Sequence, residues 1–124
     1  MPDDEVMIGR FTQNRAAFEH LLKSAQMRDG FYASSDDNQR EIMEQLAVRE
    51  IYNTGQSVRF VCTGIEHEFN GEKGYLFVRL EGGLPPWMAG KVVSKLDDVY
   101  LGSSEIRYKE LGEGWFLYLQ EVTD

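Results

Sequence analysis

The residues with the clearest chemical potential lie around an Asn-Gly pair in the middle of the chain. His67 stands between Glu66 and Glu68, and Glu72 follows Asn70-Gly71. A metal site or an acid–base site would need these side chains to converge on one point. In a strand, however, successive side chains point to opposite faces, so His67 is directed away from its two acidic neighbours. The pattern therefore favours a solvated hairpin end over a catalytic site.

The single cysteine, Cys62, is the other reactive candidate. A nucleophilic thiolate needs a neighbouring base or positive charge, whereas Cys62 follows Val58 and Phe60 at a spacing of two in an acidic chain. Burial on this apolar face would raise the pKa of the thiol, so we predict that Cys62 is a small buried hydrophobe. With one cysteine, and with His20 and His67 as the histidines, we expect no disulfide, metal or cofactor.

Motifs built on serine and glycine do not change this view. No serine lies in a Gly-x-Ser-x-Gly elbow, and no glycine pair precedes a helix that opens with Lys-Ser or Lys-Thr, as a phosphate loop would require. We therefore expect no catalytic residues and no enzyme activity. The sequence predicts a protein that binds a partner.

The charge of the chain limits which partners are favourable. Thirteen basic and 21 acidic side chains give a formal net charge of -8. Such a field repels nucleic-acid phosphates and anionic membranes, and it attracts a basic protein. We expect a basic protein partner, with neither nucleic acid nor membrane bound. The same charge would also keep an ordinary domain soluble, and that interpretation stays open.

The candidate partner-binding residues are acidic side chains in predicted loops, together with one aromatic anchor. They are Asp36, Asp37, Glu66, Glu68, Trp87, Asp97 and Asp98. Helix capping and turn formation also explain some of these aspartates. Trp87 follows Leu84-Pro85-Pro86 in a long connection, where it either covers the edge of the sheet or anchors a partner.

The elements that would position these residues change character near residue 48. Apolar residues at helical spacing, such as Met7, Phe11 and Phe18, predict one long helix over residues 4–28, and a second helix is predicted over 38–47. Beyond residue 48 the apolar spacing becomes two, which is typical of strands. Strands are expected at 48–52, 58–63, 75–80, 107–111 and 115–119. Turns are expected at Asn53 to Gln56, Asn70-Gly71 and Gly112 to Gly114.

These elements predict one α+β domain over residues 1–124, helical at 4–47 and mainly β at 48–122. We expect an antiparallel sheet of four to five strands, with the long N-terminal helix packed on one face and a short second helix. The first residues lack the basic region and apolar core of a signal peptide. A cytoplasmic location is therefore expected, or a periplasmic one if a native leader was removed.

Short segments spread over most of the chain resemble a group of small uncharacterised bacterial domains. They are Phe11-Thr12-Gln13-Asn14-Arg15, Lys73-Gly74-Tyr75, Pro85-Pro86, Leu96-Asp97, Tyr108 and Trp115-Phe116-Leu117-Tyr118. In that group an N-terminal helix precedes a Lys-Gly-Tyr strand, a Leu-Asp turn and a closing Trp-Tyr-Leu-Tyr strand. The chain departs from the pattern at Phe116, and the sequence as given begins without the lipoprotein signal of many members. The resemblance implies a bacterial origin and this order of elements, and it implies no reaction.

Size, charge and class also allow an analogy with immunity proteins, many of which are small acidic α+β proteins that neutralise bacterial toxins. By this analogy we expect a non-enzymatic immunity or inhibitor protein that binds a basic toxin or effector directly. The alternative is a small-molecule binding or regulatory module, with a pocket between helix and sheet beneath the loop from Pro85 to Trp87.

Overall fold

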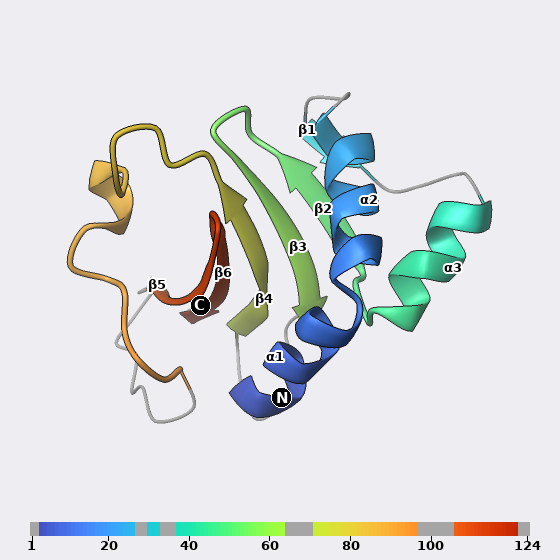
Figure 1. The fold of residues 1–124 in the computed structure, drawn as a ribbon, viewed down its shortest axis with the longest axis horizontal. Coiled ribbons are helices and arrows are strands. Elements are labelled where there is room, and N and C mark those ends of the chain that lie inside the picture. Colours follow the sequence, from blue (N-terminus) through green and yellow to red (C-terminus); the bar gives the residue numbers. More distant parts are fainter. Residues whose placement is uncertain (1–2, 27–29, 33–36, 64–70, 97–105, 122–124) are drawn as a thin grey trace.

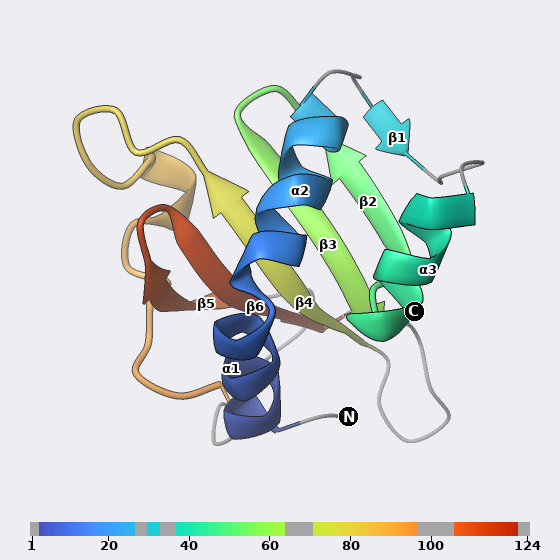
Figure 2. The same cartoon turned by 45° about the vertical axis from the view of Figure 1, so that its right-hand side comes forward.

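Three helices and a six-stranded antiparallel sheet form the described part of the chain. The computed structural model describes residues 3–26, 30–32, 37–63, 71–96 and 106–121. Figures 1 and 2 show α1 and α2 lying across one face of the sheet, with α3 beside its β1–β2 side. The expected α+β class, with an antiparallel sheet, is confirmed.

The predicted long first helix is wrong, because the chain forms two shorter helices, α1 (Asp4–Gln13) and α2 (Arg15–Gln26). The break is at Asn14, whose φ of -123° leaves the helical range. Its side-chain Nδ2 donates a hydrogen bond to the Arg10 carbonyl at 2.9 Å, so it occupies an acceptor that the helix itself uses. Both helices still bury the predicted apolar stripe, including Met7, Phe11 and Phe18.

The second predicted helix is confirmed as α3 (Asp37–Gln45). It ends just before Ala47, whose φ of 57° is left-handed. The Val48 N–H then donates to the Met43 carbonyl at 2.8 Å, which satisfies a carbonyl at the end of the helix. The side chains proposed to cap the start of α3 lie outside the described residues.

The sheet has the strand order β1-β2-β3-β4-β6-β5, and all neighbouring strands are antiparallel. Its strands are β1 (Gly30–Tyr32), β2 (Glu50–Asn53), β3 (Ser57–Thr63), β4 (Gly71–Val78), β5 (Ile106–Gly112) and β6 (Trp115–Glu121). The five longer strands correspond to the predicted ones. The three-residue β1 is additional and lies just after the residues 4–28 that were predicted as helix.

Two of the three predicted turns are described, and both are confirmed. Gly55 has a φ of 89° between β2 and β3, where its N–H is bonded to the side chain of Asn53 at 2.8 Å. Glu113 and Gly114 have φ values of 55° and 89° between β5 and β6, as a type I′ hairpin requires. The Asn70-Gly71 turn lies partly outside the described residues, although β3 and β4 do pair as predicted.

The helix face of the sheet carries the larger core, which is rich in aromatic rings. Phe18 is fully buried there, and its ring centroid lies 4.5 Å from that of Tyr75 and 6.0 Å from that of Trp115. Phe11 contacts the same rings from α1. These contacts explain why α1 and α2 pack on this face in spite of the break between them.

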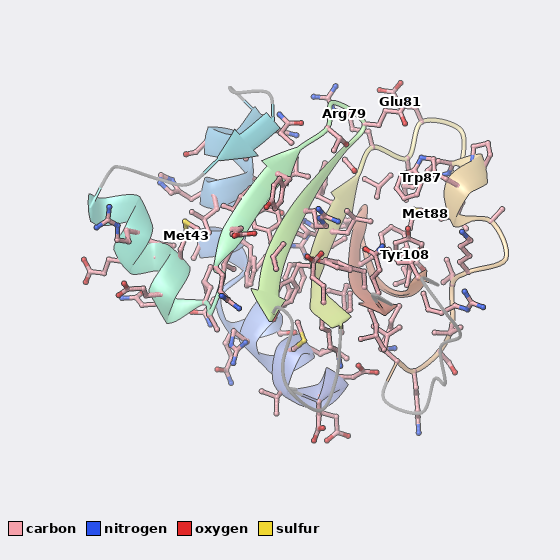
Figure 3. All side chains as sticks on the ribbon, turned by 180° about the vertical axis from the view of Figure 1, so that it is seen from behind. Met43, Arg79, Glu81, Trp87, Met88 and Tyr108 are labelled. Carbon is pink, nitrogen blue, oxygen red and sulfur yellow. The ribbon has the colours of Figure 1, made fainter. Side chains whose placement is uncertain are left out.

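Among the described residues, the long connection after β4 covers the opposite face at its β4–β6–β5 side (Figure 3). This connection contains the short 3₁₀ helix η1 (Pro86–Met88), and the fully buried Met88 packs in a second apolar cluster with Tyr108 and Phe116. The connection then pairs with β5 in parallel, since Tyr108 N–H donates to the Lys91 carbonyl at 2.9 Å. At this side the sheet is therefore sandwiched between helices and a packed loop.

Candidate functional site

Few of the predicted partner-binding residues fall in the described part of the chain. Asp36, Glu66, Glu68, Asp97 and Asp98 lie outside it, as does His67. Asp37 begins α3, but its side chain is not described. Trp87 is the exception: it lies half-buried in η1 with its ring centroid 6.0 Å from that of Tyr108. The role of the acidic residues in partner binding therefore stays a prediction.

The reactive candidate in the described residues, Cys62, is buried as predicted. Cys62 is 7% exposed in the core on the helix face, and burial raises the pKa of its thiol to about 12. Such a thiol is protonated at neutral pH and is a poor nucleophile. His20 is exposed on α2.

A polar network on the sheet face opposite α1 and α2 joins four partly exposed side chains to Tyr118, which is fully buried in the second apolar cluster. Figure 3 views the molecule from this side and shows β2 and β3 in front of the helices. None of the described helices or loops lies over these two strands here. The network spans four neighbouring strands, and we call it the polar sheet face. Its residues are Glu50, Tyr52, Arg59, Glu72 and Tyr118.

Arg59 lies at the centre of the polar sheet face. Tyr52 is its register partner on β2, and the guanidinium carbon lies 5.0 Å from the centre of the tyrosine ring. On the other side, Arg59 lies 3.4 Å from a carboxylate oxygen of Glu72 on β4. The same oxygen of Glu72 accepts a hydrogen bond from the Tyr118 hydroxyl at 2.7 Å, and Tyr52 donates to Glu50 at 2.8 Å. Contacts of this kind hold each charged group in a fixed position.

Gly74 determines where Tyr118 lies in this network. A Cβ atom at position 74 would come within 3.0 Å of the Tyr118 ring and 2.0 Å of the Phe60 carbonyl oxygen. The ring therefore occupies the space above a residue without a side chain. This position directs the Tyr118 hydroxyl toward Glu72, which lies two residues before the glycine on the same face of β4.

The tyrosines of the polar sheet face are neutral hydrogen-bond donors at physiological pH. The pKa of Tyr52 is raised, first by its hydrogen bond to Glu50. Burial is the main cause that raises the pKa of Tyr118 well above its usual value, and the charge of Glu72 adds to this effect. Both hydroxyls thus donate to carboxylates and do not act as bases.

Sequence reasoning missed most of this face. Glu72 was noticed only for its proximity to His67, and the pairing of Arg59 with Tyr52 depends on strand register. The available signal was the spacing of two in Val58, Phe60 and Cys62, which leaves Arg59 on the face opposite Phe60. The sequence does not specify the register that joins it to β2 and β4.

A second feature is an open groove of about 540 Å³ beneath the η1 loop. It is lined by Gly55, Gln56, Val78, Arg79, Glu81, Pro85, Pro86 and Trp87. The pocket expected between helix and sheet stays a prediction, because this groove has a different position. Val78 and Met88 belong to the cluster on the face opposite the helices, so the groove lies between loop and sheet.

Two absences are established for the described residues alone. No three His, Cys, Asp or Glu side chains among them come together as a metal ion would require. None of the helices there is long and apolar enough to cross a membrane. Comparison with protein-family models, curated proteins and solved structures gives no match to this chain.

Proposed function

We propose that the chain is a non-enzymatic binding protein, of the immunity or inhibitor kind, that neutralises a basic bacterial toxin or effector by direct contact. The observation that carries the proposal is the polar sheet face. Tyrosine, arginine and carboxylate side chains are joined there in one network, in which Tyr118 is fully buried and Glu50, Tyr52, Arg59 and Glu72 are partly exposed.

Charge supports a basic partner. Glu50 and Glu72 contribute two carboxylates to the face, and Arg59 contributes one cation, so the face shares the negative sign of the whole chain, whose formal charge is -8. A negative surface accelerates encounter with a basic protein and disfavours an acidic one. The effect weakens as salt screens the charges.

The residue types of the polar sheet face and their mutual contacts support tight binding of a partner. Tyrosine and arginine are enriched among the residues that dominate binding energy at protein interfaces. Tyr52 is held by Glu50, and Arg59 is held between the Tyr52 ring and Glu72. Side chains already fixed in the free protein lose less conformational entropy when a partner docks.

The state of the reactive groups supports a role without catalysis. Cys62 is buried with a raised thiol pKa, and the tyrosine hydroxyls of the polar sheet face are committed donors with raised pKa values. A general base or nucleophile needs a pKa closer to the working pH.

The first experiment identifies what contacts this face. A photo-crosslinking residue is placed at position 52 in the full chain and, as a control, at exposed position 44 on α3. Both proteins are expressed in the organism that encodes the chain. The proposal expects a basic protein captured from position 52 and not from position 44. Equal capture from the two positions would contradict it.

The captured protein is then purified and its affinity measured by calorimetry at low and high salt. Tyr52→Ala should weaken binding on the order of tenfold. The pair Glu50→Gln and Glu72→Gln should weaken binding and reduce its dependence on salt. The matched control is Glu41→Gln with Glu44→Gln, which removes the same charge from exposed positions on α3. A salt-insensitive complex, or equal losses for both pairs, would overturn the proposal.

A further inference from the structure

We propose that the groove beneath the η1 loop binds a small zwitterion of the α-amino acid class with an apolar side chain. This inference goes beyond the proposed function, because the groove shares no residue with the polar sheet face. It rests on three properties of the groove: an apolar wall, a pair of opposite charges and a suitable volume.

The apolar wall is fixed in place by the fold. Pro85 and Pro86 restrict the backbone that leads into η1, and the cap N–H of Ala89 donates to the Pro86 carbonyl. Met88 is fully buried and anchors the loop in the second apolar cluster. The Trp87 ring packs edge-on against Tyr108, with an interplanar angle of 68°. A wall held in this way is available to an apolar side chain without a large rearrangement.

The charges in the groove are Arg79 and Glu81, and Figure 3 shows both at the same end of the sheet as Trp87. Both side chains are exposed, and neither forms a salt bridge within the described residues. A ligand with only an anionic group would meet Glu81 as a like charge, and a purely cationic ligand would meet Arg79. A carboxylate and an ammonium group on one small molecule complement both.

The size of the groove agrees with such a ligand. Its volume of about 540 Å³ lies in the range of roughly 300–1,000 Å³ that is typical of small-molecule sites. The ammonium group of an amino acid can also lie over the face of an indole ring, as cations do at Trp side chains. The groove is open to solvent, so we expect weak, millimolar binding.

The test uses L-phenylalanine, its N-acetyl derivative and its carboxamide as probes of the full chain. The N-acetyl derivative lacks the ammonium group, and the carboxamide lacks the carboxylate. Binding is followed by the NMR chemical shift of the Trp87 indole N–H. The fully buried Trp115 gives a second indole signal, which is distinguished by assignment. L-phenylalanine should bind saturably, and each derivative should bind roughly two- to fivefold more weakly, since the charges involved are exposed.

Two variants test which charge of the groove pairs with which charged group of the ligand. Arg79→Gln should abolish the preference for L-phenylalanine over the carboxamide, and Glu81→Gln should abolish the preference over the N-acetyl derivative. Arg49→Gln, at an exposed position outside the groove, is the matched control and should keep both preferences. Absence of saturable binding of L-phenylalanine at millimolar concentration would overturn the inference, as would preferences unchanged in both groove variants. Neither result affects Tyr52 and the polar sheet face, so the two proposals fail separately.

Discussion

Lys73 and Asp4 form a buried ion pair, with the ammonium Nζ 2.8 Å from the carboxylate Oδ1 and side chains only 2% and 7% exposed. The other carboxylate oxygen accepts the Leu96 N–H at 2.7 Å. One carboxylate therefore joins the first turn of α1, strand β4 and the long connection between β4 and β5. The Tyr75 hydroxyl adds a second link between β4 and α1, since it donates to the Met7 carbonyl at 2.8 Å.

Removing the charge of Asp4 should destabilise the protein strongly. Asp4→Asn keeps the shape of the side chain but takes away the negative charge that Lys73 pairs with, and breaking a buried pair in this way costs about 3–5 kcal/mol. Urea unfolding of the variant measures the loss. Glu5→Gln changes an exposed carboxylate in the same helical turn and should leave the free energy of unfolding nearly unchanged.

The same pair predicts that a second substitution compensates for the first. Adding Lys73→Met to Asp4→Asn removes the remaining buried charge, so the double variant should be more stable than Asp4→Asn alone. If the effects of Asp4→Asn and Lys73→Met on the free energy of unfolding were simply additive in the double variant, the ion pair would have no energetic role.

Phe18 should be among the most sensitive core positions. It is fully buried and contacts Phe60, Tyr75 and Trp115. Phe18→Ala should lower the free energy of unfolding by about 3–5 kcal/mol, because a large cavity would remain between α2 and the sheet. His20→Ala, two residues along the same helix but exposed, serves as the control. An unchanged melting midpoint for Phe18→Ala would exclude α2 from the core.

Gly74 and Gly9 should respond in opposite directions to the same substitution. Gly74→Ala would place a Cβ atom 2.0 Å from the Phe60 carbonyl oxygen, so β3 and β4 would have to separate. We expect a loss of about 3 kcal/mol. Gly9 lies within α1 with no neighbouring atom near a new Cβ, and Gly9→Ala should stabilise by roughly 0.5–1 kcal/mol. Thermal unfolding of both variants tests this contrast.

Cys62 should make stability fall with rising pH. Its thiol pKa is about 12 in the folded protein and about 8.5 in an unfolded chain. Above about pH 8.5 the unfolded state loses this proton while the folded state keeps it, so the free energy of unfolding decreases by up to about 1.4 kcal/mol per pH unit. Cys62→Ala lacks this contribution, so its stability deficit relative to the natural chain should shrink between about pH 8 and pH 10. A constant deficit over this range would contradict the prediction.

The sequence predicted those features that depend on local spacing. The period of two placed Val58, Phe60 and Cys62 on one buried face of β3, and the Gly112 to Gly114 turn identified the β5–β6 hairpin. The helical stripe identified buried apolar residues of α1 and α2 correctly, including Met7, Phe11 and Phe18. Its continuity across Asn14 concealed the break, because the cause is a side-chain hydrogen bond that competes with the helix.

Features that depend on contacts between distant residues could not be predicted from local spacing. Asp4 and Lys73 are 69 positions apart, and nothing in the spacing of either residue indicates that they meet. The polar sheet face likewise requires the register of β2, β3, β4 and β6. The position of the groove required knowledge of which face the long connection covers.

The parallel pairing of Val92 beside Tyr108 also bears on how the protein behaves at high concentration. A bare outer strand presents unsatisfied amides that can recruit the strand of another molecule, and this is a common route to aggregation. Here the chain's own backbone occupies that position at the centre of β5, and the opposite border of the sheet is the three-residue β1. Neither outer strand offers a long stretch of unpaired backbone for strand addition. Contact with other proteins is therefore directed to the faces of the sheet and not to its edges.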